Sequence, residues 1–374
     1  MESEAYFAYL INEERKQKMT ESRIVKVFNY LHEKNITQML VTDPVSIYYL
    51  TGIKILPGER FLGLYLNSLG TNKIILNKLF HISTNSPIEK IWYFDGEDAI
   101  ESIYEYIDHN LALGVDKECK AEFLLKLINL NAAKSFVNTS FAIDIARAQK
   151  DIDEIEAMKL SSAINDKVMV EIKNRIHENI TEIELSEQLP SIYTKNGADN
   201  IAFGIVAFGK NGADPHHFPN DTKLKEGDSI IVDIGGIKNQ YYSDMTRTFF
   251  YKKVSDKGRE IYEIVKEANL EAQKAIRPGV SFSDIDKIAR DIISKNGYGN
   301  NFTHRLGHSI GLSVHDMGDV SSANQDIIRP GMIFSIEPGI YISNEFGIRI
   351  EDLVLVTDTG CESLNQYTKE LTLV

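Results

Sequence analysis

Short apolar runs alternate with helical patterns over the first 140 residues of the chain. The runs are rich in β-branched and aromatic residues and are bounded by Gly, Pro or Asn, a pattern that predicts strands. They cover residues 38–43, 61–66, 73–77, 91–95, 111–117 and 135–140. Apolar positions at helical spacing lie between them, near 19–33 and 98–111. The alternation predicts a layered α/β domain.

The period of the apolar positions changes near residue 143. Apolar side chains recur at helical spacing along 143–178 and predict one face of a long amphipathic helix packed against a sheet. They are Ile152, Ile155, Met158, Ile164, Val168, Ile172 and Ile176. Further strands follow, with two amphipathic helices at about 256–275 and 283–296. We therefore expect an N-terminal α/β domain over 1–142 and a second domain over 143–374.

Two segments of the second domain follow the same pattern. They are LKEGDSIIVDIG (224–235) and IRPGMIFSIEPG (328–339). Each predicts a turn, then a buried strand, then an acid embedded in that strand. When Gly227 is aligned with Gly331, Asp233 falls on Glu337. The alignment indicates an internal repeat that brings one carboxylate from each half.

Each segment is followed by a second acidic strand, which adds Asp244 in the first half and Glu351 in the second. Burial of an unpaired charge in a strand is destabilising, and four adjacent carboxylates would not all ionise. Two divalent cations would balance the four negative charges. A single acid could instead cap a turn or pair with Arg247 or Arg349, so it is the repeated arrangement that favours a metal centre.

The stretch FTHRLGHSIGLSVHD contains three of the nine histidines, His304, His308 and His315. Their spacing alone fits metal binding, catalysis or packing. One neutral imidazole would complete a shell of four carboxylates, and such an oxygen-rich set suits Mn²⁺, Co²⁺, Fe²⁺ or Zn²⁺. Two ions about 3.5–4 Å apart form the usual binuclear hydrolase centre.

Composition narrows the class of protein. The 374 residues are 43% hydrophobic and 25% charged, which is ordinary for a globular protein. The net charge of −13 argues against nucleic acid or an anionic membrane as a partner. Two distant cysteines, a charged N-terminus and the lack of a long apolar run lead us to expect a cytoplasmic protein.

The motifs together resemble the Xaa-Pro dipeptidases (prolidases) and aminopeptidases P, which are metallopeptidases with a pita-bread fold. The resemblance rests on DIG, SDMTRT, THRLGHSIGLSVHD, SIEPGIY and RIED in this order, and on PVSIYYLTGI (44–53). It covers essentially the whole chain and is strongest to bacterial prolidases. It implies an α/β (α+β) fold, with a creatinase/prolidase-type N-terminal domain and a C-terminal pita-bread catalytic domain that has an internal pseudo-twofold repeat.

The resemblance also implies a metal centre. It implies two divalent ions per subunit, Mn²⁺ foremost, with Co²⁺, Zn²⁺ or Fe²⁺ as alternatives. The implied ligands are Asp233, Asp244, His308, Glu337 and Glu351. In the family pattern Asp244 and Glu351 bridge or nearly bridge the two ions.

Accessory residues follow from the same resemblance. His216, His304, His315 and Arg349 match positions that bind substrate. We expect His216, His315 and Glu337 to be catalytic. Glu337 would move a proton from the attacking water to the leaving nitrogen, and His315 would donate to the scissile carbonyl. His216 would hold the substrate carboxylate or the tetrahedral intermediate.

Two roles stay open at this point. Arg349 and Glu351 are two apart on a strand and so face the same side. Arg349 therefore either grips a substrate carboxylate or neutralises a ligand carboxylate. His304 either contacts the substrate or packs behind the site. Thr246, two residues after Asp244, is a candidate hydrogen-bond donor to a ligand.

We expect small peptide substrates and favour a dipeptidase over an aminopeptidase P. A metal-free hydrolase resembling creatinase, a non-catalytic binding relative and a methionine aminopeptidase are less favoured, because the ligand set and the N-terminal domain are both present. Family members are commonly homodimers, which the resemblance therefore implies here. Two positions depart from the family pattern: Asp316 stands for a common Glu, and His217 for a frequent Tyr.

Overall fold

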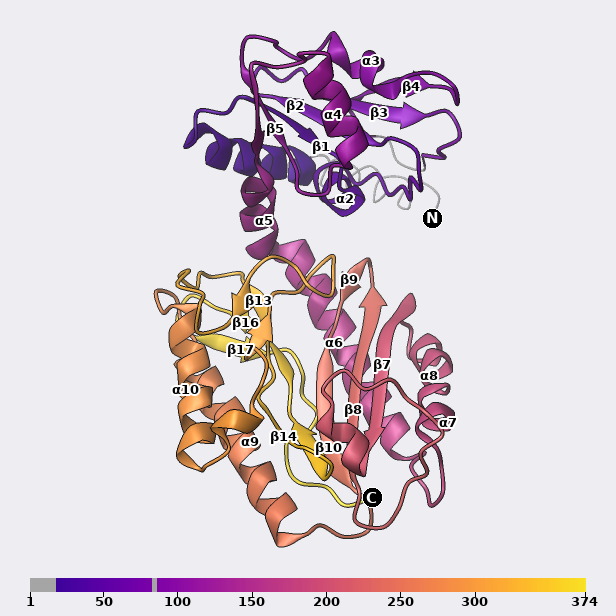
Figure 1. Cartoon of the computed structure of the whole chain (residues 1–374), viewed down its shortest axis with the longest axis vertical. Helices are drawn as coiled ribbons and strands as arrows, with labels where there is room; N and C mark the ends of the chain where they lie inside the picture. Colours follow the sequence, from indigo (N-terminus) through magenta and orange to yellow (C-terminus); the bar gives the residue numbers. More distant parts are fainter. Residues whose placement is uncertain (1–17, 83–85) are drawn as a thin grey trace, which may run out of the picture. The chain divides into compact units, whose positions relative to one another are not determined.

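The computed structural model describes residues 18–82 and 86–374, which form two compact units. The division falls between Arg147 and Ala148, at the end of helix α5. Each unit is described by itself, and Figure 1 shows the elements of both.

The first unit is built on a six-stranded sheet with the order β4-β3-β2-β1-β5-β6. Its strands are β1 (Gln38–Val41), β2 (Gly63–Asn67), β3 (Lys73–Asn77), β4 (Glu89–Tyr93), β5 (Ala112–Val115) and β6 (Ser135–Asn138). Its helices are residues 18–32, α2 (Pro44–Thr51), α3 (Ala99–Tyr104), α4 (Ala121–Asn129) and α5 (Ser140–Ala148). Each of the six predicted strands is present, and the predicted helix at 98–111 is shorter than expected.

The second unit contains the two halves of the repeat. The first half has α6 (Ile152–Lys173), α7 (Glu182–Ser186), α8 (Leu189–Lys195), β7 (Asn200–Phe208), η1 (Gly209–Ala213), β8 (Ser229–Lys238), β9 (Tyr241–Tyr242) and β10 (Met245–Phe250). The second half begins with α9 (Asp256–Ala275), α10 (Phe282–Lys295), η2 (Gly299–Asn301), β11 (Gly307–His308) and β12 (Asp319–Val320). It ends with β13 (Ile333–Ile336), β14 (Gly339–Ile342), β15 (Phe346–Arg349), β16 (Asp352–Val356) and β17 (Cys361–Ser363).

The two halves have matching turns, strand pairs and helix-to-strand hydrogen bonds. The aligned turn glycines Gly227 and Gly331 have φ values of 90° and 82°, a backbone region that favours glycine. Strand β8 then pairs antiparallel with β10, and β13 with β16. The long helices α6 and α9 each carry a buried asparagine that donates to a carbonyl beside a predicted ligand. Asn165 donates to Ile234 O at 3.1 Å, and Asn269 to Ile336 O at 2.9 Å.

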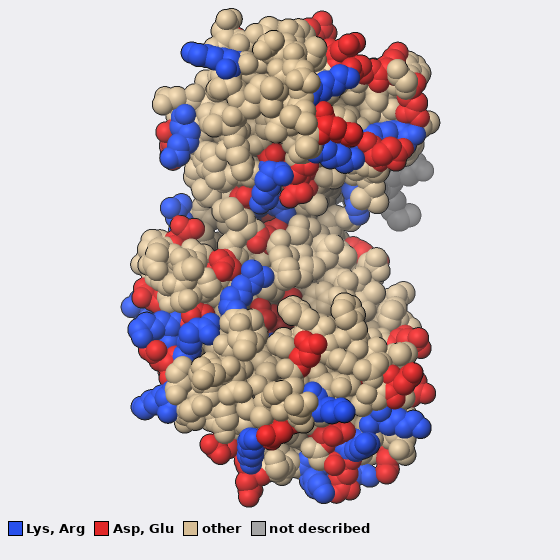
Figure 2. Space-filling model, in the orientation of Figure 1, with Lys and Arg blue, Asp and Glu red and all other residues tan. Residues whose placement is uncertain are grey.

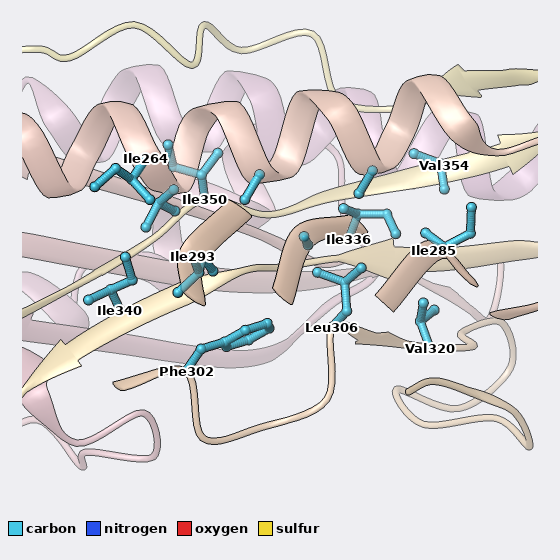
Figure 3. Packing of buried hydrophobic residues seen from close by; sticks show 14 of the residues in the cluster. Ile264, Ile285, Ile293, Phe302, Leu306, Val320, Ile336, Ile340, Ile350 and Val354 are labelled. Carbon is cyan, nitrogen blue, oxygen red and sulfur yellow. The ribbon is translucent and has the colours of Figure 1, made fainter. Parts of the chain in front are cut away.

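The core of the second half lies between its helices and its strands. Isoleucines of α9 and α10 lie in one cluster with buried side chains of the strands; Figure 3 shows Ile285 near Ile336 and Val354, and Ile264 near Ile350. These side chains are at most 6% exposed. Burial of such side chains contributes roughly 1.5–3 kcal/mol each, so this packing gives the strands that carry the acids a rigid backing.

The long helix predicted over 143–178 is instead two helices. Asp151 caps the start of α6 and forms a capping box with Glu154, which separates α6 from α5. The predicted apolar face is only partly right, because Ile152 is 62% exposed. Small and polar side chains such as Ser162 and Asn165 are buried instead, where α6 lies against β8.

Charged side chains are mixed over the molecular surface shown in Figure 2, where lysines and arginines alternate with acidic residues. The excess of 54 acidic over 41 basic residues gives the net charge of −13. Within the described ranges, every helix is too short or too polar to cross a lipid bilayer.

Candidate metal centre

The two predicted ligands of the first half belong to one small sheet. Asp233 lies in the middle of β8, which is paired with β7 on one side and β10 on the other. Asp244 lies between β9 and β10. The two residues are 9% and 4% exposed. The sheet therefore holds Asp233 within β8 and Asp244 directly before β10, and both residues are shielded from bulk water.

Three predicted ligands from the second half complete the cluster. His308 ends β11, Glu337 follows β13, and Glu351 lies between β15 and β16. His308 Nε2 is 3.6 Å from Asp244 Oδ2 and 3.5 Å from Glu337 Oε1. One ligand atom each from Asp244, His308 and Glu351 lie within 4.8 Å of one another. Residues more than 100 positions apart in sequence thus meet at one point, where the two halves join.

The orientation of His308 suits a metal ligand. Its Nδ1 lies 3.2 Å from the carbonyl oxygen of Ser309, so Nδ1 carries the proton. Nε2 then presents its lone pair to the carboxylates. The hydroxyl of Ser335 accepts from the His308 backbone N–H at 2.9 Å and donates to Glu337 Oε1 at 3.0 Å. The serine thus fixes this histidine and this acid relative to each other.

The cluster has an excess of acceptors and negative charge. Burial, together with the adjacent carboxylates, holds the pKa of Asp244 and of Glu351 well above the ordinary range. Three buried carboxylate oxygens, Asp233 Oδ1, Asp244 Oδ1 and Glu351 Oε1, have no hydrogen-bond partner among the described residues. A buried acceptor without a partner is destabilising. The donor set of carboxylate oxygens and one imidazole nitrogen fits divalent cations, and these five residues would hold them.

Metal-free protein should lose stability as the pH rises. The ordinary pKa values of Asp244 and Glu351 are 3.8 and 4.5, and both are raised in the folded state. Their contribution is therefore fully present below those values and is lost as the pH rises through the folded-state pKa values. We expect the Tm of metal-stripped protein to fall between pH 5 and pH 8, measured by thermal denaturation.

Added Mn²⁺ should reverse this loss, by about 4 kcal/mol when free metal is 1,000 times its Kd. A Tm of the metal-stripped protein that rises steadily over the same pH range, with no response to Mn²⁺, would contradict the assignment of these two acids.

Arg349 is engaged with the predicted ligands themselves. Its Nη2 donates to Asp233 Oδ2 at 2.7 Å, and its Nε donates to Thr246 Oγ1 at 3.2 Å. Thr246 in turn donates to Glu351 Oε2 at 2.6 Å. Burial by itself lowers the pKa of Arg349, but Tyr341, Asp233 and the other acids outweigh it and keep the pKa above its ordinary value. Arg349 thus pairs with the carboxylate of a predicted ligand in this structure, and direct binding of substrate by Arg349 stays a prediction.

Arg247, the other arginine near the acids, has different partners. Its Nη2 pairs with the fully buried Asp352 at 2.7 Å, and its Nη1 donates to the carbonyl oxygen of Glu351 at 2.6 Å. Arg247 therefore holds the backbone of Glu351, whereas Thr246 donates to the Glu351 carboxylate.

Tyr341 is a site residue that the sequence reasoning missed. Its hydroxyl accepts from Arg349 Nη1 at 2.9 Å and lies 2.9 Å from His304 Nε2. His304 Nδ1 lies 2.7 Å from the carbonyl oxygen of Arg305, so Nδ1 is the donor and Nε2 accepts from Tyr341. Burial lowers the pKa of His304 and raises that of Tyr341 to about 12. The available signal was its position four residues after Glu337 in SIEPGIY.

The segment that carries His304 is held from behind. Arg290 on α10 donates to the carbonyl oxygens of Phe302 and His304 at 3.1 and 3.0 Å. The same guanidinium forms two hydrogen bonds to the buried carboxylate of Asp286, at 2.9 and 2.8 Å. His304 is therefore linked to Arg349 through Tyr341, and its contact with substrate stays a prediction.

The other two accessory histidines are more exposed. The ring of His315 lies edge-on to that of His308, with 4.3 Å between centroids. Partial burial, followed by His308, lowers the pKa of His315 to about 4, so the ring is neutral at pH 7. His216 follows η1, is exposed, and also lowers the pKa of His315. The ring of His315 thus borders the cluster on a side that solvent reaches, and His216 is close enough to His315 to affect its pKa.

Comparison with known proteins places the chain in a family. Residues 156–358 match the model of metallopeptidase family M24, and residues 23–149 match the creatinase/prolidase N-terminal domain. The chain belongs to metallopeptidase family M24. An uncharacterized peptidase of Staphylococcus aureus is 35% identical to this M24 protein, over 93% of this chain and 100% of the relative.

Solved structures agree over both units of this M24 protein. A prolidase from Thermococcus sibiricus is 34% identical, with a TM-score of 0.87, over 95% of this chain and 99% of that chain. An X-Pro aminopeptidase from Thermotoga maritima is 28% identical, with a TM-score of 0.80, over 90% of this chain and 97% of that chain. The family resemblance and the fold class expected from the sequence are confirmed, and metallopeptidase is the activity class of the family.

Proposed function

We propose that this M24 protein is a Xaa-Pro dipeptidase, a prolidase that releases proline from small peptides with two divalent cations, Mn²⁺ foremost. The observation that carries the proposal is the buried acid cluster around His308, in which three carboxylate oxygens have no hydrogen-bond partner among the described residues. The likeness to a prolidase over 95% of the chain supports the substrate class. A homodimer stays a prediction.

The metal ligands would be Asp233, Asp244, His308, Glu337 and Glu351. Bound cations would polarise the scissile carbonyl and make a water molecule nucleophilic at neutral pH. Thr246 and Arg349 orient two of these ligands through the hydrogen bonds described above. Partners of this kind set the direction and basicity of a ligand.

Glu337 is well placed to move protons. Its side chain is 16% exposed, against 5% for Asp244 and 12% for Asp233, so it is the most accessible of these carboxylates. One oxygen accepts from Ser335, which fixes the carboxylate while the other oxygen is available to a water molecule. Glu337 would take the proton of the attacking water and return it to the leaving nitrogen.

His315 and His216 would contact the substrate. The neutral ring of His315 retains one N–H, which could donate to the carbonyl oxygen as negative charge develops on it. His216 on the opposing loop would hold the substrate carboxylate or the tetrahedral intermediate. Both side chains are exposed in this structure and so are open to a ligand.

An aminopeptidase P is the second candidate, because the Thermotoga maritima X-Pro aminopeptidase is also similar over 90% of the chain. Peptide length separates the two. We expect the Mn²⁺-loaded enzyme to hydrolyse Leu-Pro at least about tenfold faster, in kcat/KM, than Leu-Pro-Gly, a difference of about 1.4 kcal/mol. Chromatographic detection of released proline or Pro-Gly measures both reactions. Faster cleavage of the tripeptide would favour the aminopeptidase.

A further inference from the structure

A buried carboxylate outside the metal centre organises the loop that carries His216. Glu182, the first residue of α7, has a side chain that is 0% exposed. Its Oε1 accepts from the backbone N–H of Phe208 at 2.7 Å and from Asn211 Nδ2 at 3.0 Å. Its Oε2 lies 2.7 Å from His217 Nε2 and accepts from the backbone N–H of Asn220 at 3.1 Å. One carboxylate thus joins the start, middle and end of loop 209–222.

The same loop contacts the site on its other side. The backbones of Gly212 and Gly347 touch, because a Cβ on Gly347 would lie 1.9 Å from Gly212 O. Arg349 Nη1 donates to Pro215 O at 3.5 Å. His216, the next residue, is therefore held between Glu182 on one side and strand β15 on the other.

The internal repeat shows what this backbone position needs. Glu182 N–H donates to Thr222 O at 3.2 Å, and in the other half Phe282 N–H donates to Asp326 O at 3.1 Å. The two residues therefore occupy equivalent positions. Phe282 is 4% exposed and packs against Phe334, with 5.1 Å between ring centroids. The second half thus folds with an apolar side chain at the position of Phe282, so the fold does not require a carboxylate at the equivalent position of Glu182.

The loops of the two halves close in different ways. Phe208 pairs with Ile230 in the first half, and Ser309 pairs with Phe334 in the second. The Ser309 N–H is satisfied inside its own loop by Gly318 O at 2.7 Å. The Phe208 N–H has the Glu182 carboxylate instead. The loop that carries His315 therefore closes on itself, whereas the loop that carries His216 depends on a side chain from α7.

We propose that Glu182 is a positioning residue that fixes His216 beside the metal centre, with His217 as its side-chain partner. The proposal rests on the function proposed above, because His216 is given its role there. A displaced catalytic group is costly, and the loss of a supporting partner typically lowers activity about 10–100-fold. The four hydrogen-bond partners of the Glu182 carboxylate lie within residues 208–220, so Glu182 would act through this segment.

Glu182→Gln tests the proposal with little change in shape. The amide replaces one oxygen by an NH₂ group, which cannot accept a hydrogen bond, so the set of four hydrogen bonds is not kept intact. We expect kcat/KM for Leu-Pro to fall about 10–100-fold, with two metals retained. The split between kcat and KM should match that of His216→Ala. The double variant should be no worse than His216→Ala alone. Multiplying losses, unchanged activity or lost metal would overturn the proposal.

His217 offers a matched pair of variants should Glu182→Gln fail to fold. His217→Tyr keeps a group that can donate to Glu182, whereas His217→Phe differs from it only by the hydroxyl. We expect the phenylalanine variant to lose about tenfold more activity than the tyrosine variant. Equal losses would overturn the role of the contact.

Amide hydrogen exchange, measured by mass spectrometry, tests the anchoring without substrate. We expect faster exchange confined to residues 208–222 in Glu182→Gln and in His217→Phe. Exchange identical to wild type would overturn the proposal. A wild-type enzyme that leaves every Xaa-Pro peptide intact would count against the proposed function alone, because the exchange result does not depend on activity.

Discussion

Replacement of Glu337 by glutamine should lower kcat by about 10³–10⁴-fold and weaken metal binding. Two effects combine in this variant. The amide cannot accept the proton of the attacking water, and it offers a neutral ligand where His308 Nε2 lies 3.5 Å from a carboxylate oxygen. Steady-state hydrolysis of Leu-Pro and elemental analysis of the purified protein measure the two effects separately.

Glu345→Gln is the matched control for this variant. Glu345 forms an ion pair with Lys257 at 2.7 Å, with both side chains more than 40% exposed. Exposed pairs of this kind are worth about 0–1 kcal/mol, so we expect near-normal activity and two metals. A Glu337→Gln enzyme that keeps both metals and wild-type kcat would remove Glu337 from the mechanism.

His315→Ala should separate catalysis from metal binding. We expect kcat to fall about 10²–10³-fold while two metals remain bound, because His315 would donate to the reacting carbonyl. The ring lies against His308 with 4.3 Å between centroids and is exposed, so its loss leaves the ligand set intact. Stopped-flow or steady-state kinetics with elemental analysis measures the outcome.

His177→Ala is the matched control, because His177 is an exposed histidine outside the predicted metal centre. Its Nδ1 lies 3.1 Å from the backbone carbonyl oxygen of Glu178, and the residue is exposed at the surface. We expect wild-type kinetics for this variant. Loss of metal in His315→Ala would make His315 a ligand and show that our division between ligand and donor is wrong.

The strands and the acid cluster were accessible from sequence because local patterns encode them. The apolar runs predicted at 73–77 and 135–140 coincide with β3 and β6 to within two residues. The alignment of Gly227 with Gly331 was sufficient to align Asp233 with Glu337, because both turns require a positive φ and both strands are buried. The spacing of apolar residues and the residues that form turns are local features of the sequence, so they predict local structure without knowledge of distant contacts.

Contacts between distant segments were not accessible in the same way. Tyr341 meets His304 across 37 residues, and Arg349 meets Asp233 across 116. A periodic pattern does not encode which distant acid pairs with a buried arginine. The sequence therefore left two roles open for Arg349, and its contact with Asp233 appears only in the structure. Glu182 is an example of the same kind, because its four donors lie in residues 208–220, the first of them 26 residues later in the sequence.

The helix over 143–178 shows a third limit. Counting apolar residues placed Ile152 on the buried face, yet the side chain is 62% exposed. The capping box of Asp151 and Glu154 starts a new helix there and changes which face meets the sheet. Close packing of α6 on β8 selects small and polar residues that a hydrophobic pattern overlooks, such as Ser162 and Asn165.

Titration of metal-stripped enzyme with Mn²⁺, with Leu-Pro hydrolysis followed at each addition, tests the binuclear dipeptidase most directly. We predict no hydrolysis before metal is added and a rate that reaches its plateau at two ions per chain. Hydrolysis of Leu-Pro by the metal-free enzyme, or a fully loaded enzyme that leaves Leu-Pro intact, would contradict this function.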